Sequence, residues 1–147
     1  MLPTSYINEC EVITNIDHLG IAVANINDAI ELYTKLFNVT QWHREHVSDQ
    51  GVEIASFVLG SIRIELTAAS QPDSPIAKFI EKRGEGIHHV ALYSDDIRTD
   101  LEIAESKGMR LIDKEPRSGA HNMQIAFLHP STTKGVLMEF CSKADTH

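Results

Sequence analysis

The chain is poor in cysteine, has no excess of positive charge and contains no long apolar run. Its 147 residues include two cysteines, Cys10 and Cys141, and carry a formal net charge of −8. Two cysteines so far apart form neither a metal-binding motif nor a disulfide framework, so a reducing, cytoplasmic location is the default expectation. The negative charge argues against nucleic acid as a partner, because a phosphate backbone is bound through basic residues.

Membrane and export signals are also missing. No segment has the roughly 20 consecutive apolar residues that cross a bilayer, and the start MLPTSYINECEV lacks the basic and apolar regions of a signal peptide. We therefore expect no membrane partner. Residues 1–14 are expected to be an N-terminal extension or an extra edge segment, and residues 15–147 to form one domain with a buried apolar core.

The most informative feature of the chain is an internal repeat. Residues 16–31 read IDHLGIAVANINDAIE and residues 87–102 read IHHVALYSDDIRTDLE, which places His18 and His89 at the same position of the two copies. Each copy later has a strand-like segment with one carboxylate, Glu65 in IRIEL and Glu139 in VLMEF. A module that offers one His and one Glu per copy can assemble a site of two His and two Glu.

The hydrophobic pattern predicts a β-α-β-β-β order in each copy. Asn25 or Asn27 can cap the first helix, and Ser74-Pro75 begins a linking helix that ends at Gly84. We expect an α+β fold: two tandem βαβββ modules form a curved, barrel-like mixed sheet around a metal site, with helices outside. The modules are predicted at about 15–67 and 86–141 with a helical linker at about 68–85; the strands at 15–24, 39–47, 53–59, 62–67, 87–93, 109–113, 123–128 and 135–141; and a second-module helix at 96–107.

Strand alternation separates the expected ligands from the packing residues. Small residues, Gly20 and Ala22, share the strand face of His18, and Ala91 shares the face of His89, which leaves room for a ligand. Glu65 and Glu139 each lie between apolar neighbours that point the other way. Burying an isolated carboxylate is costly, and a bound metal offsets that cost.

A single His or Glu on a strand is ordinarily a structural or solvated residue, and only the matched positions favour a site. His88 is expected to point with the outer, packing set. The other histidines, His43, His46, His121, His129 and His147, do not follow the repeat. His43 and His46 lie in the charged run HREH, which is typical of a solvated edge. Trp42 and the phenylalanines are expected in the core.

Several segments resemble a known family. The doubled module with ligands on its first and last strands is similar to the vicinal-oxygen-chelate superfamily, and within it to the methylmalonyl-CoA epimerases. The matching segments are IDHLGIAV (16–23), EHVSDQGVEIASFVLG (45–60), SPIAKFIEKRGEGIHHVAL (74–92), LIDKEPRSGAH (111–121) and FLHPSTTKGVLMEF (127–140). Glyoxalase I shares the His-and-Glu scheme but not these segments.

The resemblance implies a metal enzyme. It implies that His18, Glu65, His89 and Glu139 bind one divalent cation, and their mixed nitrogen and oxygen donors suit cobalt, nickel, manganese or zinc. The implied reaction inverts C2 of methylmalonyl-CoA by removal and return of the α-proton, with Glu139 and Glu65 as the acid–base pair. Some relatives have a second glutamate at the position of Ile54.

In this chain Glu53 is adjacent to Ile54 but has the opposite strand phase, so Glu53 is expected to point outward into solvent. Binding of CoA calls for basic contacts, and Arg117, Lys114 and Lys134 are the candidates, although they could equally be ordinary surface charges. We also expect a homodimer. Two alternatives stay open: a glyoxalase I-like enzyme that acts on a glutathione hemithioacetal, and a non-catalytic binding or resistance module of the same fold.

Overall fold

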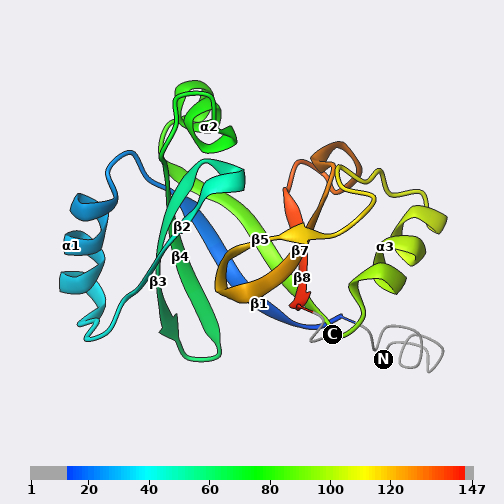
Figure 1. Cartoon of the computed structure of the whole chain (residues 1–147), viewed down its shortest axis with the longest axis horizontal. Helices are drawn as coiled ribbons and strands as arrows, with labels where there is room; N and C mark the ends of the chain where they lie inside the picture. The colour runs from blue at the N-terminus through cyan, green and yellow to red at the C-terminus, as the bar shows by residue number, and fades with distance from the viewer. Residues whose placement is uncertain (1–12, 145–147) are drawn as a thin grey trace. The chain divides into compact units, whose positions relative to one another are not determined.

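The computed structural model describes residues 13–144, which form eight strands and three α-helices (Figure 1). The elements confirm the α+β class and the doubled β-α-β-β-β order. They are β1 (Ile13–Ala22), α1 (Ile26–Phe37), β2 (His43–Val47), β3 (Val52–Leu59), β4 (Ile62–Ala69), α2 (Pro75–Arg83), β5 (Gly86–Ser94), α3 (Ile97–Ser106), β6 (Arg117–Ser118), β7 (Met123–Leu128) and β8 (Met138–Lys143).

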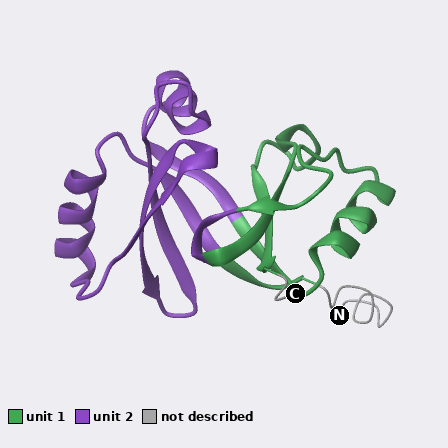
Figure 2. Ribbon diagram, in the orientation of Figure 1, with its two compact units in different colours: residues 1–17, 91–118, 122–147 green, residues 18–90, 119–121 purple. Residues whose placement is uncertain are grey.

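The hydrogen-bonded strand order is β2-β3-β4-β1-β5-β8-β7-β6. The sheet is mixed, because β1 and β4 are parallel whereas β2–β3, β3–β4, β6–β7 and β7–β8 are antiparallel. The chain divides into two compact units (Figure 2). Among the described residues, unit 1 contains 13–17, 91–118 and 122–144, and unit 2 contains 18–90 and 119–121. Strands β1 and β5 each contribute residues to both units.

In unit 2, α1 covers one face of the sheet. Its buried residues Ile26 and Ala29 join a core that includes Phe57, Ile64 and Leu66 of β3 and β4. The neighbours of Glu65 therefore pack under α1, as their strand phase predicts, and Glu65 points to the opposite face. On that face a second apolar cluster brings residues of β1, β2 and β3 against α2; its buried members are Ala22, Val47, Val52, Ile54 and Ile76.

In unit 1, α3 packs against β7 and β8. Leu101 of α3 lies in a core with Leu128 of β7 and Phe140 of β8. A smaller cluster holds Ala91 and Cys141 beside two further buried residues of β7. Ser94, at the end of β5, donates a hydrogen bond to the buried carboxylate of Asp100 on α3. This contact ties the helix to the strand that precedes it.

The predicted helix starts are confirmed. The Asn25 side chain accepts the Asp28 amide, and the Ser74 side chain accepts the Ala77 amide ahead of a helix that has proline in its first turn. These caps satisfy amides that have no partner within a helix. Asp96 caps α3 in the same way.

Two strand predictions were wrong. Residues 109–113 form no regular strand: the amides of Ile112 and Asp113 both donate to the carbonyl of Phe127, and the Asp113 carboxylate accepts the Phe127 amide. That side chain replaces a backbone partner, so pairing is reduced to one bridge between Leu111 and Leu128. The last strand begins at Met138 rather than residue 135, because Lys134 and Gly135 have positive φ and close a turn after Pro130.

Strand β2 is also shorter than predicted and begins at His43. Of the proposed extension 1–14, residues 1–12 lie outside the described residues, and residues 13 and 14 belong to β1. Within the described part of the chain, no helix is both long enough and apolar enough to span a membrane.

A candidate metal site and an adjoining histidine cluster

Three of the four predicted ligands converge within unit 2. His18 of β1, Glu65 of β4 and His89 of β5 are all buried, with exposed fractions of 4%, 4% and 6%. The His18 Nε2 atom lies 3.2 Å from His89 Nε2 and 3.7 Å from Glu65 Oε2. One potential ligand atom from each residue lies within 4.8 Å of the others.

Gly20 makes room for this arrangement. It follows His18 by two positions on the same face of β1 and pairs in register with Glu65 of β4. A Cβ atom built on Gly20 would lie 2.1 Å from Cε1 and 2.4 Å from Nδ1 of His89, far inside van der Waals contact. The His89 ring therefore occupies the space that any side chain at position 20 would fill.

The spacing of these donors fits one divalent cation. Metal bonds to imidazole nitrogen and carboxylate oxygen are about 2.0–2.2 Å long. Neighbouring ligands in octahedral or tetrahedral geometry then lie about 3.0–3.5 Å apart. The His18–His89 distance falls inside this range and the His18–Glu65 distance lies just above it. Two imidazoles and one carboxylate also form the mixed donor set that late first-row metals prefer.

The surrounding hydrogen bonds specify the tautomers of both rings. Arg63 Nη2 lies 3.2 Å from His18 Nδ1, and a guanidinium can only donate, so the proton of neutral His18 is on Nε2, facing His89 Nε2. His89 Nε2 then accepts the hydrogen bond from His18, so the proton of a neutral His89 is on Nδ1. This Nδ1 atom lies 2.9 Å from Nδ1 of His88. His89 thus has the tautomer that an Nε2 ligand would need, whereas a neutral His18 would bind a metal through Nε2 only with its proton on Nδ1, which would break the contact with Arg63.

His88 supports this pair from the side of α2. Its ring packs edge-on against Phe79, with 5.0 Å between centroids, and burial lowers its pKa to about 4. His88 is consequently neutral near pH 7, and its Nδ1 can accept a hydrogen bond from His89 Nδ1. An acceptor behind a ligating histidine fixes the orientation of that ring. As the strand phase predicts, His88 does not itself join the donor group.

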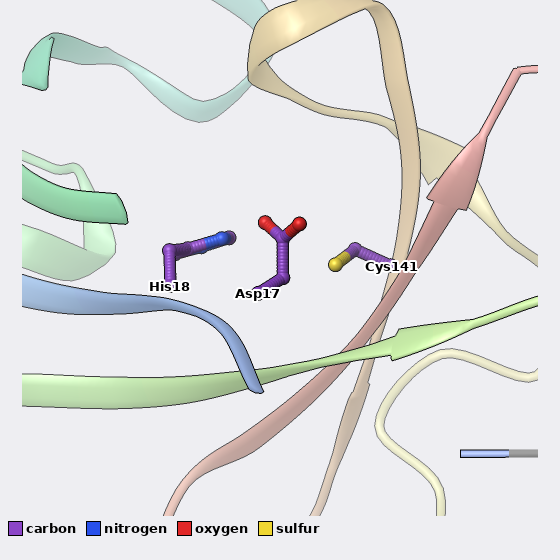
Figure 3. Close-up of side chains that lie close together, drawn as sticks. All are labelled: Asp17, His18 and Cys141. Atoms are coloured by element: carbon purple, nitrogen blue, oxygen red, sulfur yellow. The ribbon is translucent and has the colours of Figure 1, made fainter. Parts of the chain in front are cut away.

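The fourth predicted ligand, Glu139, lies in unit 1. It is on β8, opposite Phe127 in the register, and has an exposed fraction of 3%. Unit 1 also contains a carboxylate and thiol that face each other, those of Asp17 and Cys141 (Figure 3). Asp17 immediately precedes His18 in the chain. Cys141 is buried, its thiol donates a hydrogen bond to the Leu92 carbonyl, and its position on β8 is two residues beyond Glu139.

A second polar cluster in unit 2 contains residues that the repeat did not identify. His43 Nε2 lies 3.0 Å from Glu45 Oε1, and the same oxygen accepts the backbone amide of His121 at 3.0 Å. The His121 ring lies beside the His43 ring with 4.3 Å between centroids, and its Nε2 lies 3.1 Å from Ser56 Oγ. The two ring planes are tilted by 32°, and one potential ligand atom from each of His43, Glu45 and His121 lies within 4.8 Å of the others.

The electrostatics of this cluster favour a neutral imidazole beside a carboxylate. Burial, followed by the charge of Arg63, lowers the pKa of His121 to about 4. Burial is the largest single effect on Glu45 and opposes ionisation, but the hydrogen bonds from His121 and His43 and the charges of these two residues together outweigh it and lower the pKa of Glu45. The HREH segment is therefore only partly a solvated edge: His43 and His46 are exposed as predicted, whereas Glu45 is half-buried.

The remaining predicted residues are on the surface. Glu53 is exposed and Ile54 is buried on the face of the metal donors, which confirms the strand phase inferred for this segment. Arg117 is exposed, lies 3.4 Å from the Asp113 carboxylate and covers the ring of Phe127. Lys114 and Lys134 are exposed as well. Sequence reasoning missed Glu45 and His121; the available signal was that both lie in segments that resemble the epimerases, 45–60 and 111–121.

Comparison with known proteins places the chain in a family. Residues 17–127 match the model of the glyoxalase/bleomycin resistance protein/dioxygenase superfamily. The chain is 40% identical to an uncharacterised protein of Bacillus subtilis, over 90% of this chain and 95% of that protein. Its sequence is 35% identical to that of methylmalonyl-CoA epimerase from Mycobacterium tuberculosis. The crystal structure of that protein superposes with a TM-score of 0.87 and covers 99% of this chain and 94% of that one.

A variant of Streptomyces coelicolor methylmalonyl-CoA epimerase in complex with 2-nitronate-propionyl-CoA is 33% identical, with a TM-score of 0.86 and coverage of 90% and 96%. The chain belongs to the glyoxalase/bleomycin resistance protein/dioxygenase superfamily. Within that superfamily its similarity to the methylmalonyl-CoA epimerases, expected from the sequence, is confirmed in both sequence and fold.

Proposed function

We propose that this protein is a metal-dependent methylmalonyl-CoA epimerase that inverts C2 of its substrate. The observation that carries the proposal is the buried group His18, Glu65 and His89, whose donor atoms lie within 4.8 Å of one another. The similarity to epimerases, one of them in complex with an acyl-CoA analogue, supplies the reaction class and the substrate class. A non-catalytic binding module has no need to maintain such a buried, ionisable donor set.

The metal would be held by His18, Glu65 and His89, with Glu139 proposed as the fourth ligand. The repeat supports Glu139, because it occupies in the second module the place that Glu65 has in the first. Its burial between Met138 and Phe140 also requires compensation for the carboxylate. A divalent cation there would supply a Lewis acid for the negative charge that develops on the thioester oxygen as the α-proton leaves.

The protein side chains would move the proton. Glu139 and Glu65 are the proposed proton carriers, because a carboxylate beside the cation is close to the acidified α-carbon. Glu53 is not a candidate, since it is exposed and points away from the face that carries His18 and Glu65. Arg63 would balance part of the negative charge near this pair, at 3.5 Å from Glu65 Oε2.

The phosphates of CoA would be bound by exposed cations. Arg117, Lys114 and Lys134 are proposed for this role, and all three lie in segments that resemble the epimerases. Arg117 forms an ion pair with Asp113 and covers the ring of Phe127. A homodimer and a cytoplasmic location stay predictions.

The test compares two substrates on one metal-loaded sample. The protein is loaded separately with cobalt, nickel, manganese or zinc, and bound metal is quantified. Each methylmalonyl-CoA epimer is then incubated in heavy water, and inversion and deuterium incorporation at C2 are followed by NMR. We expect both, together with little turnover of the hemithioacetal of methylglyoxal and glutathione. Faster turnover of the hemithioacetal would instead assign a glyoxalase-like activity.

The same loaded samples test the ligand set. A metal-bound crystal structure is expected to show His18, Glu65, His89 and Glu139 around one ion. Coordination through His88 in place of His89, or an ion held by other residues, would contradict the assignment.

A further inference from the structure

Inversion of a carbon centre needs proton transfer on both of its faces. A group that removes the α-proton from one side leaves a planar intermediate, and a proton must then arrive from the opposite side. Glu65 and Glu139 are proposed above as both metal ligands and proton carriers, and a carboxylate bound to a cation is a weaker base than a free group. A proton carrier that is not a ligand, yet adjoins the donor group, would complete the site.

His121 has this position within unit 2. Ser56 of β3 is directly opposite Glu65 of β4 in the register, so their side chains share one face of the sheet. Ser56 is buried, and its Oγ lies 3.1 Å from His121 Nε2. The His121 ring is therefore one side chain away from a proposed metal ligand.

The backbone at His121 is held in an unusual conformation. His121 and Asn122 have φ values of 57° and 56°, the left-handed region that residues other than glycine seldom adopt. The hydrogen bond from the His121 amide to Glu45 holds this turn, and Glu45 is itself directly opposite Ile54 in the register of β2 and β3. Such conformations persist where surrounding contacts fix them, and they concentrate at functional sites.

Among the described residues, the strand face that carries Ser56 is mostly apolar beyond that residue. The face continues from Ser56 into an apolar cluster that includes Ile54, Val52 and Ala22. His43 lies behind His121 and is exposed, whereas His88 faces Phe79 and the far side of the His89 ring. Among the described histidines that are not proposed ligands, His88 contacts the Nδ1 atom of His89, whereas His121 bonds to Ser56 on the strand face that also carries Glu65.

We propose that His121, in place of Glu65, is the second proton carrier of the epimerisation beside Glu139, with Ser56 and Glu45 as the residues that position it. The inference rests on the proposed function. In one direction the neutral imidazole takes the α-proton as the C–H bond breaks, and the electron pair of that bond moves to the thioester oxygen. A carboxylic acid on the opposite side then gives its proton to the α-carbon. In the other direction the imidazolium gives the proton and the carboxylate takes it.

Each turnover exchanges one proton between the two carriers, and solvent restores their starting states. The low pKa of His121 agrees with the base form of the imidazole being predominant near pH 7. Glu45 stabilises the imidazolium when it forms, since its carboxylate and the ring interact electrostatically.

The test uses His121→Asn, because asparagine tolerates the left-handed conformation and so preserves the turn. The control is His46→Gln on the exposed face of β2, where His46 contacts only the surface residue Ser70 among the described hydrogen bonds. Folding is checked by urea denaturation and bound metal is quantified in every sample. Deuterium incorporation at C2 is then measured separately from each methylmalonyl-CoA epimer, with both proteins loaded with the same metal.

We expect His121→Asn to retain its metal and to lose at least 100-fold in exchange from one epimer, while exchange from the other epimer stays within about threefold (100-fold is about 2.7 kcal/mol). Inversion should fall in both directions. His46→Gln should behave as the wild type. Exchange that persists from both epimers, or that falls equally from both with metal retained, would overturn the role of His121. A wild-type protein that exchanges neither epimer would overturn the proposed function and the inference with it.

The positioning role of Glu45 is tested by Glu45→Gln, which keeps an acceptor oxygen for the His121 amide but removes the charge. The imidazolium loses its stabilising partner, so the acidic limb of the exchange rate against pH should move to lower pH for the affected epimer. An unchanged limb would show that Glu45 has a structural role only.

Discussion

Replacement of Gly20 by alanine tests the candidate metal site most directly. The new methyl group would lie 2.1 Å from Cε1 of His89, whereas carbon atoms in contact are about 3.5–4.0 Å apart. Either the ring or the strand must move by more than about 1 Å. Metal bonds tolerate deviations of only about 0.2 Å, so a shift of this size removes His89 from the ligand set.

The expected result is a loss of at least 100-fold in metal affinity, about 2.7 kcal/mol. Folding should weaken by only about 1–3 kcal/mol, the usual cost of overpacking. Affinity is measured by calorimetric titration of the metal-free protein with zinc or cobalt, and stability by urea denaturation of the same samples. The separation of the two quantities matters, because a merely unfolded variant would also fail to bind metal.

Gly60→Ala provides the matched control. Gly60 has φ of +65° and no atom within 4 Å of an added Cβ, so alanine there strains the backbone without touching any neighbour. It should destabilise the fold by about 1 kcal/mol and leave metal affinity unchanged. If Gly20→Ala bound metal within about threefold of the wild type while remaining folded, the His89 ring would not occupy the space beside Gly20 and the reasoning would fail.

Three further predictions concern other parts of the chain. Glu53→Gln should leave inversion largely intact, whereas Glu139→Gln should abolish it; a hundredfold loss in the first variant with metal retained would refute the outward orientation of Glu53. Ser94→Ala should lower the free energy of unfolding by about 1–3 kcal/mol at pH 7, because it removes a donor from the buried Asp100 carboxylate; a change below about 0.5 kcal/mol would show that this carboxylate finds another partner. Finally, the free energy of unfolding of the metal-free protein should fall as pH drops from about 6.5 to about 4. In this range His121 is protonated in the unfolded chain but stays neutral in the folded protein. Solvent screening of the half-buried ring limits this contribution to about 1–2 kcal/mol, and His121→Asn should remove it in urea denaturation measured across that pH range.

The sequence alone determined the features that depend on local pattern. Alternation along the strands placed His18, Gly20 and Ala22 on one face of β1 and turned Glu53 outward, because successive side chains of a strand point to opposite faces. The helix starts at Asn25 and Ser74 were equally readable, since a capping side chain bonds to amides only two or three positions ahead. The repeat then related His18 to His89 and Glu65 to Glu139 without any knowledge of distances.

Only the tertiary structure decided what depends on contacts between distant segments. His121 meets Glu45, 76 positions away, and Ser56, 65 positions away, through a left-handed turn that no periodic pattern encodes. The segment 109–113 has the composition of a strand, yet the Asp113 side chain takes the amide that a neighbouring strand would have bonded. Hydrophobic periodicity shows on which face of its helix or strand a residue lies. The partner that the residue contacts on that face depends on strand register and on side chains that compete for the same backbone groups.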